Sequence, residues 1–154
     1  HILVIGTGET AAMISKSLNK KNYPFDVTSM TIERSTAFSK VLGGKPIKFE
    51  EVISGFDKFD VIFVATTADY FIINYNRIGR LMENKKKGTL ILDISDPRAV
   101  DEKISTFPGM KLMFRDQIDE KHEEFVRASK EKVPAVEKMI SKQVPIIGAF
   151  MKRD

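Results

Sequence analysis

The feature that most constrains the fold is an apolar run that leads directly into a glycine-rich turn at the start of the sequence. The first twelve residues are HILVIGTGETAA, in which Ile2 to Ile5 are all aliphatic. A continuous aliphatic run that ends at glycine is typical of a buried strand in a parallel sheet. Apolar and small residues then recur at helical spacing: Ala11, Ile14, Ser15 and Leu18. The pattern predicts a strand, a tight turn and a helix in immediate succession.

The turn has the pattern Gly6-x-Gly8-x-x-Ala11. Gly6 permits a tight turn, Gly8 lets the backbone approach a ligand closely, and Ala11 lets the helix pack close to the strand. The free N–H groups at the start of the helix, from Gly8 to Thr10, then face an anion. Strand, glycine turn and helix in this order form the phosphate-binding unit of a dinucleotide-binding fold. The alternative is a plain strand-to-helix turn that binds no nucleotide.

The remaining sequence alternates between strand and helix patterns. We expect further strands at residues 25–30, 45–49, 59–65, 89–94 and 111–114, and helices at 31–42, 50–56 and 74–84. This alternation predicts an α/β fold, a Rossmann-type doubly wound parallel sheet with helices on both faces. From Asp116 the pattern is helical, with interruptions expected at Pro134 and Pro145. We therefore predict an NAD(P)-binding domain over residues 1–115 and a helical extension over residues 116–154.

Composition restricts the chemistry. The 154 residues are 42% hydrophobic and 30% charged, as in a globular protein, and they contain no cysteine. Disulfides, thiolate catalysis and cysteine metal sites are therefore excluded within this chain, and the sequence indicates no catalytic residue or metal site. No apolar run approaches the ~20 residues of a membrane span, so we expect a cytoplasmic location and no membrane contact. The net charge of +4 permits an anionic partner without demonstrating one.

Several separated segments resemble glutamyl-tRNA reductases. The turn from Ile5 to Ala11 resembles their Gly-Ala-Gly-Glu-Met signature, and Ala65 to Ala68 resembles their Ala-Thr-Ser/Ala-Ser loop. The segment from Asp93 to Arg98 is similar to their Asp-Ile/Leu-Ala/Ser-Val-Pro-Arg motif. Phe107-Pro-Gly-Met110 and Phe114-Arg-Asp116 are similar to a Leu-Pro-Gly-Val…Tyr-Asp pattern. The resemblance covers nearly the whole chain.

The resemblance implies a function and partners. The family reduces glutamate carried on its tRNA to glutamate-1-semialdehyde, the first committed step of five-carbon tetrapyrrole (porphyrin and haem) synthesis. It implies that this chain is the NADPH-binding domain of such an oxidoreductase. The family's thioester-forming cysteine lies in an amino-terminal domain, so the chain alone should bind cofactor without turnover. A strand that starts at His1 also suggests a piece of a longer protein. Further implied partners are a second copy, joined through the C-terminal helix, and the downstream glutamate-1-semialdehyde aminomutase.

Candidate cofactor-binding residues follow from the glycine turn, from the strand ends at which open α/β sheets bind ligands, and from the resemblance. They are Gly6, Thr7, Gly8, Glu9, Thr10, Ser29, Met30, Thr31, Arg34, Ala65, Thr66, Thr67, Asp93, Ile94, Ser95 and Pro97. For the polar residues after the later strands, loop capping is the alternative role. The sequence leaves open whether Asp93 orients a loop or only caps it, and whether Arg98 faces the active-site side or forms a structural ion pair.

The chain departs from the family where the ribose of the cofactor is expected. The family usually has Asn-Arg-Thr after the second strand, but this chain has Ser29-Met30-Thr31 and so lacks the arginine. No carboxylate stands there either, as an NAD-specific protein would require. Ser29 and Thr31 can donate to a 2′-phosphate, and Arg34 can bind the same phosphate through two parallel N–H groups. NADP is therefore favoured, although Arg34 is equally well explained as an exposed helix cation.

Two other functions remain open. A shikimate-dehydrogenase-like NADP oxidoreductase shares the strand–glycine–helix start, but it does not use the Asp93-to-Arg98 arrangement. A nucleotide-sensing regulatory module uses the same glycine turn, but it normally has an acidic residue at the end of the second strand, which is lacking here.

Overall fold

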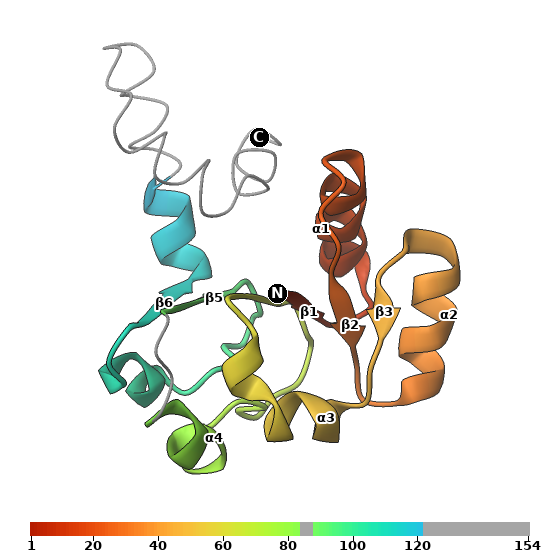
Figure 1. Ribbon diagram of the computed structural model, residues 1–154. Coiled ribbons are helices and arrows are strands. Elements are labelled where there is room, and N and C mark those ends of the chain that lie inside the picture. Colours follow the sequence, from red (N-terminus) through yellow and green to blue (C-terminus); the bar gives the residue numbers. More distant parts are fainter. Residues whose placement is uncertain (84–87, 122–154) are drawn as a thin grey trace. The chain divides into compact units, whose positions relative to one another are not determined.

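The structure is a computed structural model that describes residues 1–83 and 88–121 (Figure 1). The chain divides into two compact units, His1–Phe114 and Arg115–Asp154. Of the second unit, residues 115–121 are described, and they are helical. The predictions for Pro134, Pro145 and the helix beyond residue 121 lie outside the described residues.

The first unit contains the expected parallel sheet. Its strands are β1 (Ile2–Ile5), β2 (Asp26–Thr28), β3 (Lys45–Pro46), β4 (Val61–Val64), β5 (Thr89–Asp93) and β6 (Met110–Phe114). They form one six-stranded sheet in the order β3-β2-β1-β4-β5-β6, and every neighbouring pair is parallel. Strands β2 and β3 are added on one side of β1, and strands β4 to β6 are added on its other side. The predicted doubly wound parallel sheet is therefore confirmed, and its switch point lies between β1 and β4.

Helices connect the strands. They are α1 (Glu9–Lys20), α2 (Ile32–Leu42), α3 (Phe49–Ser54) and α4 (Tyr75–Met82), with 3₁₀ turns η1 (Phe56–Lys58) and η2 (Glu102–Thr106). Because crossovers between parallel strands are right-handed, α1 and α2 cover one face and α3 and α4 cover the other. Among the described residues, no helix combines the length and the apolar character that crossing a bilayer requires.

The helix after the glycine turn buries the stripe predicted from the sequence. Ala11, Ile14, Ser15 and Leu18 are the buried residues of α1. On the other face, alternate residues of the central strands, among them Leu3, Ile62 and Ile91, are fully buried. They belong to one apolar cluster that also contains Phe56 and residues of α3 and α4. Burying each such side chain contributes roughly 1.5–3 kcal/mol, so this cluster anchors α3 and α4.

The third strand is shorter than predicted, and this is the main correction to the expected elements. We expected strand structure over residues 45–49, but β3 has two residues and Phe49 begins α3. Glu51 explains the difference, because its carboxylate accepts the Lys48 backbone N–H at 2.9 Å and so starts a helix there. Pro46 has no N–H to extend the ladder. The sequence patterns also did not predict η2.

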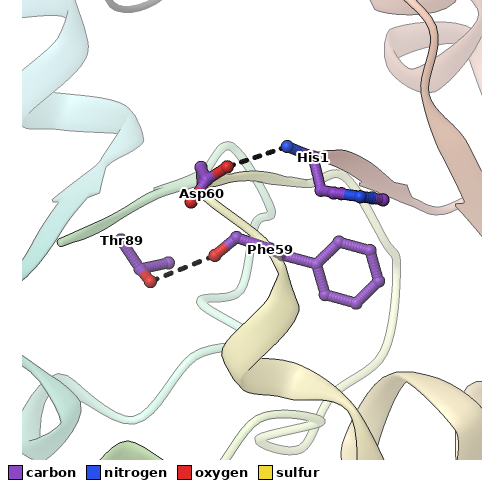
Figure 2. A network of polar contacts seen from close by, with 4 residues as sticks. All are labelled: His1, Phe59, Asp60 and Thr89. Carbon is purple, nitrogen blue, oxygen red and sulfur yellow. Dashed lines mark hydrogen bonds and ion pairs between the residues drawn. The ribbon is translucent and has the colours of Figure 1, made fainter. Parts of the chain in front are cut away.

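Polar contacts join the starts of three central strands (Figure 2). The α-amino group of His1 lies 2.8 Å from the Asp60 carboxylate, which connects β1 to the residue before β4. The buried Thr89 hydroxyl donates to the Phe59 carbonyl at 3.1 Å, which connects β5 to the same segment. These contacts lie at the amino-terminal ends of the strands, whereas the predicted site lies at their carboxyl ends.

Candidate functional site

A cleft of about 560 Å³ lies where β1, β2 and β4 end. Residues that follow these strands line it, together with residues of α2, α3 and α4. The lining residues are Ile5, Gly6, Thr7, Gly8, Ser29, Met30, Arg34, Phe49, Glu50, Ala65, Thr66, Thr67, Ala68, Tyr70, Ile72 and Arg77. The cleft is therefore at the switch point of the sheet, where open α/β folds bind ligands.

Gly6 occupies a position that admits no side chain. Its φ is +122°, and a Cβ placed on it would lie 1.9 Å from the Ala65 carbonyl oxygen. Its N–H donates to the Thr28 carbonyl at 2.8 Å. The ends of β1, β2 and β4 therefore converge on this residue, and the close approach explains why the turn requires glycine.

Gly8 is the N-cap of α1, and it lines the cleft. No side chain caps this helix start, so the first-turn N–H groups have no partner within the helix. A Cβ on Gly8 would meet open space. Unsatisfied N–H groups, the positive end of the helix dipole and open space together form an anion site.

The turn between β2 and α2 forms a second wall of the cleft. Ser29, Met30 and Arg34 line it, whereas Thr31 does not. The Thr31 hydroxyl instead accepts the Arg34 backbone N–H at 3.3 Å and caps α2. The Ser29 hydroxyl donates to the Thr31 carbonyl at 3.0 Å and lies 3.1 Å from the Ser35 hydroxyl. Thr31 thus orders the turn, and Ser29 and Arg34 face the cleft.

The loop after β4 contributes Ala65, Thr66 and Thr67 to the cleft. Ser95, which follows β5, holds this loop in place. Its hydroxyl accepts the Thr66 N–H at 3.1 Å and lies 3.3 Å from the Val64 carbonyl oxygen. Ser95 is 5% exposed and does not line the cleft. It acts on the site through Thr66.

Asp93 is fully buried at the end of β5. Its carboxylate accepts backbone N–H groups from Ala99 at 2.8 Å, Val100 at 3.0 Å and Ser95 at 3.1 Å. The peptide bond before Pro97 in this loop is cis. The carboxylate therefore organises the loop after β5 and does not reach the cleft.

The structure divides the predicted cofactor residues into two groups. Those that line the cleft are Gly6, Thr7, Gly8, Ser29, Met30, Arg34, Ala65, Thr66 and Thr67. Those that do not are Glu9, Thr10, Thr31, Asp93, Ile94, Ser95 and Pro97. Three members of the second group use their side chains to order loops beside the cleft: Thr31, Asp93 and Ser95.

Sequence reasoning missed the far wall of the cleft. Phe49, Glu50, Tyr70, Ile72 and Arg77 also line it. The Tyr70 hydroxyl lies 3.4 Å from the sulfur of Met30, 40 residues away in the sequence. No local motif marks these residues, because two crossovers bring them to the cleft. The aromatic residues Tyr70 and Phe71, which follow the fourth strand, are a sequence signal that could have indicated this wall.

The donors in the cleft suit a phosphate-bearing nucleotide. They are the N–H groups at the start of α1, the hydroxyls of Thr66 and Thr67, and the guanidinium groups of Arg34 and Arg77, with Glu50 as the carboxylate of the lining. Apolar and aromatic side chains supply surface for a base. Among the described residues, no cluster of His, Asp or Glu is arranged to hold a metal ion.

Comparison with known proteins gives two kinds of match. The family model described as shikimate / quinate 5-dehydrogenase matches residues 1–121. Glutamyl-tRNA reductase of Cenarchaeum symbiosum is 47% identical over 152 residues, which are 99% of this chain and 36% of that protein. Glutamyl-tRNA reductase of Methanothrix thermoacetophila is 34% identical over 99% of this chain and 37% of that protein. The chain thus spans less than two fifths of these relatives, and the resemblance inferred from the motifs is confirmed.

Solved structures show the same fold. Glutamyl-tRNA reductase from Methanopyrus kandleri superposes with a TM-score of 0.73 at 24% identity, over 99% of this chain and 39% of that chain. The nucleotide-binding domain of glutamyl-tRNA reductase from Thermoplasma volcanium superposes with a TM-score of 0.61 at 21% identity, over 82% of this chain and 83% of that one.

Proposed function

The chain belongs to the shikimate / quinate 5-dehydrogenase family, and we propose that its residues 1–115 are the NADPH-binding domain of a glutamyl-tRNA reductase. The single observation that carries the binding proposal is the cleft into which the glycine turn and the uncapped start of α1 both open. The relatives at 47% and 34% identity support the choice of enzyme within the family.

In this proposal the cleft holds the adenosine and phosphate part of the cofactor. The N–H groups that follow Gly8 hold the pyrophosphate, since they are the anion donors at the start of α1. Ser29 and Arg34 hold the ribose end, and Thr66 and Thr67 border the path of the cofactor toward β5. When bound, the nicotinamide supplies a hydride for reduction. The chain's own residues bind and orient the cofactor.

We propose NADPH in preference to NADH. The turn after β2 places a hydroxyl and a guanidinium group on the cleft, from Ser29 and Arg34, and it contributes no carboxylate. A carboxylate there would accept the ribose hydroxyls of NAD and repel a 2′-phosphate. The donor set therefore fits the phosphorylated ribose better.

The activity of the longer enzyme is also a proposal. It would reduce glutamyl-tRNA to glutamate-1-semialdehyde for tetrapyrrole synthesis, through a cysteine thioester formed outside this chain. This chain contains no cysteine, so the nucleophile has to come from elsewhere in the protein. We further propose a cytoplasmic homodimer joined through residues 116–154, with the aminomutase as the recipient of the product.

Titration of NADPH and NADH into the purified chain tests the cofactor proposal. We expect saturable binding of both, with NADPH tighter. Failure of both nucleotides to bind would refute the nucleotide site, and tighter NADH would refute the NADPH preference. Sedimentation equilibrium tests the dimer, which a purely monomeric chain would contradict.

A second candidate is a shikimate-dehydrogenase-like oxidoreductase, which the matching family model favours. The two candidates share the cofactor domain and differ in substrate. A longer protein that contains this chain should reduce glutamyl-tRNA with NADPH and should not oxidise shikimate with NADP. The opposite result would favour the second candidate.

A further inference from the structure

We propose that Arg77, in the first turn of α4, binds the phosphate on the adenosine ribose of the nucleotide and so contributes to selection of NADPH over NADH. The inference rests on the proposed function, because it takes the cleft to be the nucleotide site. It adds a specificity-determining residue on the wall of the cleft that the motifs did not indicate.

Arg77 and Arg34 reach the same cleft from opposite faces of the sheet. Arg34 belongs to α2, and Arg77 belongs to α4 on the other face. Glu50 is the carboxylate of the lining, so the ionised side chains of the cleft leave a positive balance. A group of high negative charge between the two guanidinium groups would be attracted by both.

The place of Arg77 in its helix is electrostatically unfavourable without an anion. The first turn of α4 contains no acidic residue, and Asn74 caps it by accepting the Arg77 backbone N–H at 3.0 Å. A cation near a helix start is repelled by the positive end of the dipole. Local conflicts of this kind concentrate at functional sites, and a bound phosphate would relieve this one.

The contacts of the Arg77 side chain hold it at the cleft and leave most of its donors for a ligand. One N–H donates to the Ile72 carbonyl over a long 3.4 Å, and the guanidinium carbon lies 5.9 Å from the centre of the Phe49 ring. Within residues 1–83 and 88–121 it forms no ion pair with a carboxylate. A guanidinium group has five N–H donors, so a fork that suits a phosphate remains.

The ribose phosphate is a better match than the pyrophosphate. The start of α1 already provides the pyrophosphate site, next to Gly8. The segment that leads to α4 touches the ribose end of the cleft, because the Tyr70 hydroxyl lies 3.4 Å from the Met30 sulfur. Met30 stands after β2 and contributes no charge. Arg77 follows this segment and lines the same cleft, and in this proposal it supplies the cation that Met30 lacks.

Calorimetric titration of the chain with NADPH, NADH and adenosine 2′,5′-bisphosphate tests this assignment. Arg77→Met should weaken NADPH and the bisphosphate by about tenfold or more, and NADH by less than about threefold. Arg77→Lys should give an intermediate loss, because it keeps the charge without the fork. Arg80→Met is the matched control, since Arg80 is exposed on the same helix and does not line the cleft, and it should change none of the affinities.

Two results would overturn the assignment. Equal losses for NADPH and NADH in Arg77→Met would place the guanidinium group on a part that both nucleotides share. Unchanged NADPH affinity would remove Arg77 from the site. Thermal unfolding of each variant separates a binding loss from a folding loss, and Arg77→Lys keeps the comparison valid if Arg77→Met unfolds. If the unmodified chain binds neither nucleotide, the proposed function itself fails.

Discussion

The α-carbon of Gly6 faces the carbonyl oxygen of Ala65 so closely that a Cβ on Gly6 would lie 1.9 Å from that oxygen. Gly6 directly follows β1, and Ala65 directly follows β4, the neighbour of β1 in the sheet. At the switch point of the sheet, the backbone after β1 therefore packs directly against the backbone after β4. The glycine turn and the loop after β4 therefore form one wall of the cleft.

Gly6→Ala should therefore destabilise the whole domain. The added methyl group would force the two strand ends apart, and its φ of +122° is strained for any L-residue with a side chain. We expect a loss of about 3 kcal/mol or more in the free energy of unfolding. Urea denaturation measures it, and a loss below about 1 kcal/mol would contradict the rigid contact.

Gly8→Ala should leave the stability of the domain nearly unchanged and should weaken NADPH binding. A Cβ on Gly8 meets open space, and its φ of −88° suits alanine, so the fold should tolerate the change. The methyl group would enter the space through which a phosphate approaches α1, so NADPH affinity should fall by about tenfold or more. Thermal unfolding and titration of the same sample check both parts. Full retention of affinity would place the pyrophosphate elsewhere.

Asp93→Asn should destabilise the loop after β5. One Asp93 oxygen accepts two backbone N–H groups and the other accepts a third, and an amide NH₂ cannot replace an acceptor. We expect a loss of about 2–3 kcal/mol in the free energy of unfolding by urea denaturation. Asp96→Asn is the control, because Asp96 is exposed in the same loop, and it should have almost no effect. Equal effects of the two variants would contradict the buried role of Asp93.

Met30→Arg should strengthen NADPH binding relative to NADH. The resemblance implies an arginine at this position, and Met30 lines the cleft with an exposed side chain. We expect the ratio of NADH to NADPH dissociation constants to rise by about tenfold, as a charge-assisted hydrogen bond would give. Met30→Leu is the apolar control. An unchanged ratio in Met30→Arg would show that the ribose phosphate does not lie beside this residue.

Asp26 makes the stability depend on pH. Burial raises the pKa of its carboxyl above the ordinary 3.8, although the neighbouring Lys45 lowers it in part. The folded state therefore favours the protonated form. The stabilisation from this proton is complete below pH 3.8 and is lost as the pH rises through the folded pKa.

Asp26→Asn removes this dependence. The stability of the variant relative to the parent should rise as the pH is raised from below 3.8 toward 7, and it should then stay level. Urea denaturation across this range measures the difference. Asp57→Asn is the control, because Asp57 is exposed in η1, and its curve should follow the parent. An Asp26→Asn curve parallel to the parent would contradict the burial effect.

The sequence by itself determined the features that depend on neighbours in the chain. The glycine turn, the buried stripe of α1 and the alternation of strands with helices are local patterns, and a parallel doubly wound sheet follows from them. The position of Gly6 and Gly8 at the switch point follows as well, because strand order places the first turn there.

Only the tertiary structure decided the other wall of the site and the roles of several polar residues. Tyr70 contacts Met30 in the turn after β2, and Arg77 of α4 lines the same cleft, although no spacing in the sequence records this approach. Asp93 and Ser95 carry the same polar groups as ligand-binding residues, but their burial directs those groups to backbone partners. Residue type shows which hydrogen bonds a side chain can form, and packing decides whether a ligand or the protein's own backbone receives them.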